Sequence, residues 1–173
     1  MRAALTLLTL ATLASCKPPP TDADMGRELL EAKPTTASAP LPSPDSEGAV
    51  WKVSAMDANS IIYGVPGSPA LMALTCLNDS APPRVRITRL SPADEGAGAL
   101  LAFVGNGHIG RIAVDAAEVQ GKTIWQGDIL AADEKLEPLA GPRQLTATIP
   151  GAGMVTLNPS SVPMRWLETC RAG

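Results

Sequence analysis

The sequence is poor in aromatic side chains and in histidine. Its 173 residues include three tryptophans, one tyrosine, one phenylalanine and one histidine. Sites that bind single-stranded nucleic acid or sugars stack their ligands on several exposed rings, so this composition argues against both ligand classes. A zinc site needs three or four ligands, which one histidine and two cysteines expected to be oxidised do not supply. We therefore expect no metal, no cofactor and no nucleic-acid partner.

The chain also lacks a strong excess of either charge. It carries 14 Lys and Arg against 17 Asp and Glu, a formal net charge of −3. Its carboxylates are scattered singly, which disfavours a paired acid–base site and an EF-hand calcium loop. His108 would need a nucleophile and an orienting carboxylate to act as a general base, and the sequence does not place Asp115 or Asp128 beside it. We predict no catalytic residues and a protein that is not an enzyme.

No apolar run in the sequence is long enough to span a membrane. Residues 3–13 contain only Ala, Leu and Thr, whereas a transmembrane helix needs about 20 apolar residues. Arg2 precedes this run, and small residues follow it up to Cys16. A basic start, a short apolar stretch and small residues before a cleavage point are typical of a secretion signal. We predict that residues 1–15 are a signal peptide.

The run Leu13-Ala14-Ser15-Cys16 resembles the lipobox of bacterial lipoproteins. The resemblance implies cleavage before Cys16, attachment of diacylglycerol to its thiol, and a mature protein anchored in the membrane by its lipid. Several acyl chains hold a protein at a membrane far better than one. Lipoprotein sorting associates Asp after the cysteine with the inner membrane, so Lys17 favours the outer membrane, facing the periplasm. The alternative is an ordinary signal peptide that leaves Cys16 as a free thiol.

A proline-rich segment follows the predicted lipidation site. Residues 16–49 contain few large apolar side chains, so they bury too little surface to offset the entropy of ordering. Proline-rich sequence favours a semi-extended spacer over a collapsed coil. We predict three parts: the signal peptide over residues 1–15, the lipidated cysteine with a disordered tether over residues 16–49, and a folded domain over residues 50–173.

The predicted domain shows the two-residue period of β-strands. Residues 144–149 alternate polar and apolar without a fault, and residues 84–89 do so with Val85 and Ile87 inward and the three arginines in water. Short strands about ten residues apart predict an all-β fold, a small antiparallel sandwich or barrel. Strands are predicted over residues 51–55, 60–63, 70–77, 84–89, 99–104, 109–115, 123–125, 144–149 and 154–157.

Two short helical segments complete the predicted domain. Asp133 is suited to cap a single helical turn, and a C-terminal helix is expected over residues 163–170. Ser160 or Ser161 would cap this helix, with a proline just inside its start. We expect the helix to lay Trp166 onto the sheet.

Cys76 and Cys170 remain as a pair once Cys16 carries a lipid. An exported chain matures in an oxidising compartment, so this pair predicts one disulfide. The bond would close a loop of about 95 residues and contribute at most about 4–5 kcal/mol. The alternative, two reduced catalytic or metal-binding thiols, is weaker because the sequence has no C-x-x-C motif.

Residues 105–111, Gly-Asn-Gly-His-Ile-Gly-Arg, are the most conspicuous local motif. Their glycine spacing fits G-x-G-x-x-G, but a dinucleotide site needs a helix after it, and the next residues are strand-like. Asn-Gly between apolar runs predicts a hairpin turn instead. We name Asn106, His108 and Arg111 as a candidate binding loop, with an ordinary exposed loop as the alternative.

The domain is similar in its spacing to two groups of small exported β-domains. Its opening Trp51-Lys52-Val53-Ser54, with cysteines at 76 and 170, resembles the invasion-associated locus B family and accessory proteins of type VI secretion. That resemblance implies a β-sandwich binding module without catalysis. A second resemblance is to membrane-bound lysozyme inhibitors, in which residues 105–111 would be the inserted loop. We expect a lipid-anchored protein that binds or scaffolds another envelope protein. The alternatives are an inhibitor of an exported enzyme, a carrier of apolar ligands, and a periplasmic hydrolase.

Overall fold

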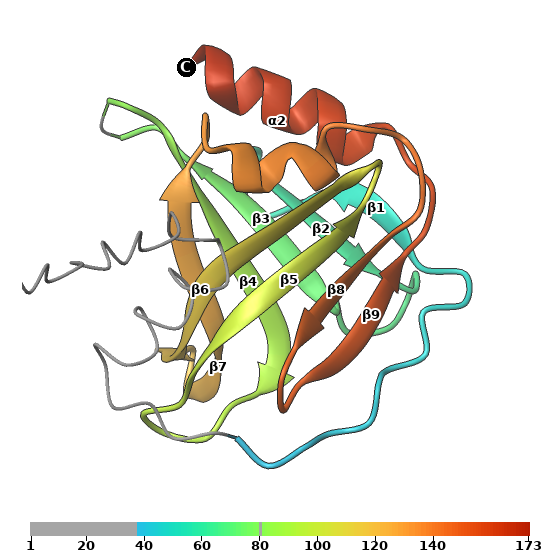
Figure 1. The fold of residues 1–173 in the computed structure, drawn as a ribbon, viewed down its shortest axis with the longest axis vertical. Coiled ribbons are helices and arrows are strands. Elements are labelled where there is room, and N and C mark those ends of the chain that lie inside the picture. Colours follow the sequence, from blue (N-terminus) through green and yellow to red (C-terminus); the bar gives the residue numbers. More distant parts are fainter. Residues whose placement is uncertain (1–37, 80) are drawn as a thin grey trace, which may run out of the picture.

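The computed structural model describes residues 38–79 and 81–173 (Figure 1). They form a nine-stranded antiparallel sheet in the order β1-β2-β3-β4-β7-β6-β5-β8-β9, curled into a nearly closed barrel. The strands are β1 (Val50–Val53), β2 (Ser60–Gly64), β3 (Met72–Leu77), β4 (Arg84–Pro92), β5 (Gly98–Gly105), β6 (His108–Val119), β7 (Lys122–Leu130), β8 (Leu145–Ile149) and β9 (Gly153–Leu157). The predicted all-β fold is confirmed. The predicted signal peptide and Cys16 lie outside the described residues.

Two tight turns set the longest hairpins of the barrel. Asn106 and Gly107 have φ values of 52° and 86°, which confirms the predicted turn between β5 and β6. Gln120 and Gly121, at 51° and 75°, turn β6 into β7 in the same way. Because glutamine is an unusual residue for positive φ, the sequence did not reveal this second turn, and β6 and β7 extend beyond their predicted ends.

The inside of the barrel is filled by side chains. Trp125, Tyr63 and Phe103 are the largest of them, and each is at most 1% exposed. On β8 the burial alternates residue by residue, with Leu145 and the two apolar residues after it inward, as the sequence predicted. The core is therefore built from the inward positions of strands distributed around the whole sheet.

The barrel closes between β1 and β9 through side chains. The Tyr63 hydroxyl, on β2, donates to the Thr156 carbonyl at 2.9 Å and accepts from the Asn158 N–H at 3.0 Å. The Asn158 amide donates to the carbonyls of Ala49 at 2.9 Å and Ser46 at 3.1 Å. These groups replace the strand pairing that would otherwise join the two ends of the sheet.

Residues 38–46, which we call the strap, run along the outer edge of β9 (Figure 1). The Leu41 N–H donates to the Gly151 carbonyl, and the Met154 N–H donates to Ser43 Oγ. The last part of the predicted tether is therefore in contact with the barrel, where the sequence predicted a free spacer.

The prediction that all three arginines of β4 face water was wrong for Arg89. It lies four residues from Val85 and two from Ile87, so it points to the same inner face of the strand. Arg89 is 4% exposed, and its guanidinium donates to the Leu71 carbonyl at 2.7 Å and the Ala152 carbonyl at 3.3 Å. Burial lowers its pKa to about 10, so it is still charged at neutral pH.

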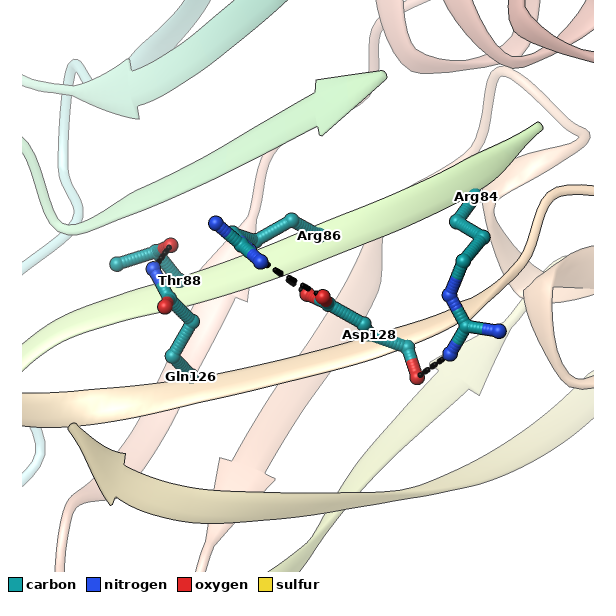
Figure 2. A network of polar contacts seen from close by, with 5 residues as sticks. All are labelled: Arg84, Arg86, Thr88, Gln126 and Asp128. Atoms are coloured by element: carbon teal, nitrogen blue, oxygen red, sulfur yellow. Dashed lines mark hydrogen bonds and ion pairs between the residues drawn. The ribbon is translucent and has the colours of Figure 1, made fainter. Parts of the chain in front are cut away.

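The other two arginines lie on the outer face of β4 and are partnered by β7 (Figure 2). Arg86 forms a two-pronged ion pair with the Asp128 carboxylate, at 2.8 and 2.7 Å. Arg84 donates to the Asp128 backbone carbonyl at 3.0 Å. The hydrogen bonds to Asp128 raise the pKa of Arg86. On this outer face the two arginines therefore link β4 to β7, and the Asp128 carboxylate offsets the charge of Arg86.

Helices η1 (Glu134–Leu139) and α2 (Val162–Ala172) lie across one end of the barrel (Figure 1). Asp133 caps η1 as predicted by accepting from the Lys135 N–H at 2.9 Å. At the start of α2, Ser160 Oγ accepts from the Val162 N–H at 3.1 Å, whereas the Ser161 side chain makes no capping bond.

The predicted Cys76–Cys170 disulfide is present and fastens α2 to β3. The bond joins residues 94 positions apart in the sequence. Trp166 lies partly buried beneath α2, as expected, and its indole N–H donates to the Asn59 carbonyl at 2.9 Å. Both ends of the described domain are thus tied to the sheet, the C-terminal end covalently.

Candidate functional site at the turn between β5 and β6

The Asn106 side chain holds the turn between β5 and β6 against the segment that links η1 to β8. Its amide donates to the carbonyls of Pro138 at 2.8 Å and Gly141 at 3.1 Å. Its oxygen accepts from the Arg143 N–H at 3.0 Å. With its donors and acceptor all engaged, Asn106 fixes two chain segments more than 30 residues apart. The predicted hairpin turn is therefore fastened to a distant part of the chain.

A surface hollow of about 260 Å³ opens beside this turn. It combines an imidazole, a guanidinium, a carboxylate and amide groups within one small concave surface. Its lining residues are Asn106, His108, Glu137, Ala140, Gly141, Pro142 and Arg143. His108 and Arg143 are exposed on it, which leaves a ring nitrogen and a guanidinium available to a ligand.

Glu137 supplies the acidic group of this hollow and anchors it to α2. The Arg171 guanidinium donates to Glu137 Oε1 at 2.8 Å and to the Ala131 carbonyl at 2.8 Å. The ion pair is only partly exposed, with the two side chains 28% and 36% accessible. The C-terminal helix thereby supports the wall of the hollow, and much of the Glu137 charge is offset from within the protein.

The three glycines of the G-x-G-x-x-G-like run have structural roles. A Cβ on Gly105 would collide with Leu145 on β8, and one on Gly110 would collide with the Lys135 carbonyl of η1. Gly107 has the positive φ that the turn needs. The residues after the run form β6, so the helix that a dinucleotide site requires is absent from this position.

The structure brings two of the three predicted loop residues together. Asn106 and His108 both line the hollow, whereas Arg111 does not. Arg111 is exposed on β6 and alternates with the buried Gly110 and Ile112, so it faces the outside of the barrel. The odd spacing between His108 and Arg111 places them on opposite faces of the strand, which the sequence period already implied.

The carboxylates considered as partners of His108 lie elsewhere. Asp115 is seven residues further along the extended β6, roughly 23 Å away. Asp128, on β7, is paired with Arg86 of β4. Among residues 38–79 and 81–173, no cluster of three His, Cys, Asp or Glu side chains is placed to hold a metal ion. Neither carboxylate considered from the sequence therefore lies beside His108, and the carboxylate that lines the hollow is Glu137, which is paired with Arg171.

Sequence reasoning missed Glu137 and Arg143 as members of this site. Asp133 indicated the start of a single helical turn, but no local signal indicates what that turn packs on. The contact is made through Asn106, whose side chain reaches across from a distant hairpin. A tertiary hydrogen bond of this kind leaves no period or motif in a single sequence.

Comparison with known proteins gives no match: no family model, no curated protein and no solved structure matches this chain. The part of the chain that the structure describes contains no helix long and apolar enough to cross a membrane.

Proposed function

We propose that this protein is a lipid-anchored binding protein of the bacterial cell envelope that holds a protein partner at the hollow beside Asn106. The signal peptide and the lipobox ending at Cys16 support the location, and Lys17 favours the outer membrane. The predicted tether gives the domain reach and a high effective concentration near the membrane. In this proposal the protein acts by binding and has no catalytic activity.

The observation that carries the binding site is the fastening of the turn by Asn106. A partner that binds a preformed surface does not have to order it, and this saving leaves more of the interaction energy as affinity. His108 and Arg143 stand exposed on that fixed surface and offer hydrogen-bond donors to carboxylate or carbonyl groups. We expect the partner to present an acidic or carbonyl-rich segment to the hollow.

Three other functions receive less support from the geometry. A carrier of apolar ligands needs an internal cavity, and the barrel centre is occupied by Trp125 and Phe103. An inhibitor that inserts residues 105–111 into an enzyme needs a protruding loop, and this turn is short and bonded to its neighbours. A hydrolase that uses His108 needs a nucleophile and an orienting carboxylate beside it; Asp115 and Asp128 lie elsewhere, and Glu137, in the hollow, is paired with Arg171.

The anchor is tested by substitution of the cysteine. The full chain and its Cys16→Ala variant are expressed in a bacterium supplied with a radiolabelled fatty acid. We expect label and membrane sedimentation for the natural chain and neither for Cys16→Ala. A matched Cys76→Ala/Cys170→Ala variant should keep its label, because it loses only the two cysteines of the disulfide and retains Cys16. A labelled Cys16→Ala chain would contradict the anchor without bearing on the hollow.

The binding site is tested by photo-crosslinking of the full lipoprotein in the envelope. A photoreactive amino acid replaces Arg143 in one variant and Lys122 in the control. Lys122 follows the turn at the far end of the 12-residue β6, roughly 35 Å from the turn between β5 and β6. We expect a discrete crosslinked protein from position 143 and none of that species from position 122. Equal products at both positions, or none at either, would contradict the proposed site.

A further inference from the structure

The strap closes the free edge of β9 with little strand pairing. The Leu41 N–H donates to the Gly151 carbonyl at 2.9 Å, and the Met154 N–H donates to Ser43 Oγ at 3.0 Å. A Cβ on Gly153 would lie 2.8 Å from the Ser43 Cα, so the two segments are in close contact. The strap runs parallel to β9, because both segments advance together along these contacts.

Side chains clamp the strap at both of its ends. At its start, Ser38 Oγ accepts from the Asp94 N–H at 2.8 Å, and the Asp94 carboxylate accepts from the Ala39 N–H at 3.1 Å. At its end, the Ser46 carbonyl accepts from the Asn158 amide at 3.1 Å. The strap thus occupies the place of an additional edge strand beside the start of β9, whereas Tyr63 serves the Thr156 carbonyl and the Asn158 N–H farther along.

Its proline spacing makes the strap a poor template for a further strand. Prolines stand at positions 40, 42 and 44. In an extended segment successive N–H groups point to opposite sides, and the Leu41 N–H points toward the β8–β9 hairpin, where it donates to Gly151. The positions that would point their N–H groups outward are therefore the proline positions, which have no N–H to donate. Exposed sheet edges are commonly protected in this manner against pairing with another chain.

We propose that the strap is an edge guard, which keeps β9 of one copy from pairing with the sheet edge of a second copy of this chain. A membrane anchor would concentrate copies in two dimensions, where an open edge invites association. Met154 and Leu41, 44% and 39% exposed, would supply apolar contacts to such a pairing if the guard were lost. The segment predicted as a spacer then has a second role in keeping the domain monomeric.

The first experiment gives the strap the outward N–H donors that its prolines lack. The mature chain, residues 16–173, carries Cys16→Ser so that no lipid is attached, and its dimer dissociation constant is measured by sedimentation equilibrium. We expect Pro40→Thr/Pro42→Thr/Pro44→Thr to dimerise about tenfold more tightly or better, since each replacement adds an outward N–H that can donate to the second copy. The matched control, Pro18→Thr/Pro19→Thr/Pro20→Thr, removes as many prolines outside the strap and should behave as the parent chain.

A second variant removes the guard instead of altering it. Ser38→Ala/Leu41→Pro/Ser43→Ala, the strap-detached chain, eliminates both hydrogen bonds to the β8–β9 hairpin and the Ser38 bond of the N-terminal clamp. Met154→Cys reports pairing of two β9 edges by forming an intermolecular disulfide. We expect this disulfide in the strap-detached chain and not in Met154→Cys alone. If both the proline variant and the detached chain keep a native near-ultraviolet spectrum and remain as monomeric as the parent, the edge-guard proposal is overturned. If the proline variant loses that spectrum, the detached chain decides.

Discussion

The hydroxyl of Tyr63 accepts a hydrogen bond from the Asn158 N–H at 3.0 Å and so joins β2 to the far end of the same sheet. The same hydroxyl donates to the Thr156 carbonyl at 2.9 Å. One buried side-chain atom thus bonds a carbonyl of β9 and the N–H of the residue that follows β9. A neighbouring strand would ordinarily satisfy those two groups. Tyr63 is therefore one of two side chains that close the barrel, together with the Asn158 amide that bonds Ala49 and Ser46.

Removal of that hydroxyl should destabilise the barrel. Tyr63→Phe keeps the ring but leaves one N–H and one C=O without their partner, at a cost of about 1–3 kcal/mol in the free energy of unfolding. Urea unfolding followed by tryptophan fluorescence measures this change. Thr169→Ala, which deletes an exposed hydroxyl on α2, is the control and should change the free energy by less than about 0.5 kcal/mol. Equal effects of the two substitutions would contradict the closure by Tyr63.

Alkaline pH should open the same closure. Burial raises the pKa of Tyr63 above its usual 10.0, so the folded state keeps the proton that the unfolded state releases. Its contribution is complete below the ordinary tyrosine pKa and is lost as pH rises through the folded value. Because the chain has one tyrosine, the tyrosinate absorbance reports this group alone. We expect ionisation above pH 10 together with unfolding; ionisation at the ordinary pKa in a folded chain would refute the burial argument.

Two arginines of β4 should differ sharply in their importance. Arg89→Ala removes the donors of two interior carbonyls and leaves a cavity, which should cost roughly 2–5 kcal/mol. Arg86→Ala removes an ion pair whose side chains are 40% and 29% exposed, which should cost about 1 kcal/mol or less. Denaturant unfolding of both variants provides the comparison. Similar costs would show that Arg89 is not held inside the barrel.

The disulfide should account for a large part of the stability of the C-terminal helix. Cys170→Ser opens a crosslink between residues 94 positions apart, and loop-closure entropy gives an upper value of about 4–5 kcal/mol. We expect the Tm to fall by at least several degrees. A reducing agent should lower the Tm of the natural chain to that of the variant and leave the variant unchanged. An unchanged Tm in both comparisons would exclude a stabilising bond.

The sheet was predictable because its signals are local. The alternation on β8 and the Asn106-Gly107 turn both appear within a few residues, and each strand was expected near its observed place. The alternation on β4 places Arg89 on the same inner face as Ile87. A charged side chain was nevertheless assumed to lie in water. The prediction for Arg89 was wrong because the charge of its side chain was given more weight than its position in the two-residue alternation.

The closure of the barrel and the candidate site were not predictable for a different reason. Tyr63 reaches a backbone more than 90 residues away, and Asn106 bonds a segment more than 30 residues away. Such bonds satisfy buried polar groups wherever the fold leaves them, so their partners depend on the complete structure. The sequence marked Asn106 and His108 as conspicuous, and only the fold added Glu137 and Arg143 to them.

The most direct test of the proposed function asks whether partner binding at the hollow requires the turn to be fastened by Asn106. The photoreactive amino acid at position 143 is introduced into the natural chain and into Asn106→Ala, and the yield of the crosslinked partner is compared at equal protein levels in the envelope. Asn106→Ala removes the hydrogen bonds that fasten the turn, so we predict a severalfold loss of crosslinking while the chain remains anchored and folded. An undiminished yield from a folded Asn106→Ala chain would contradict the account of a preformed binding surface.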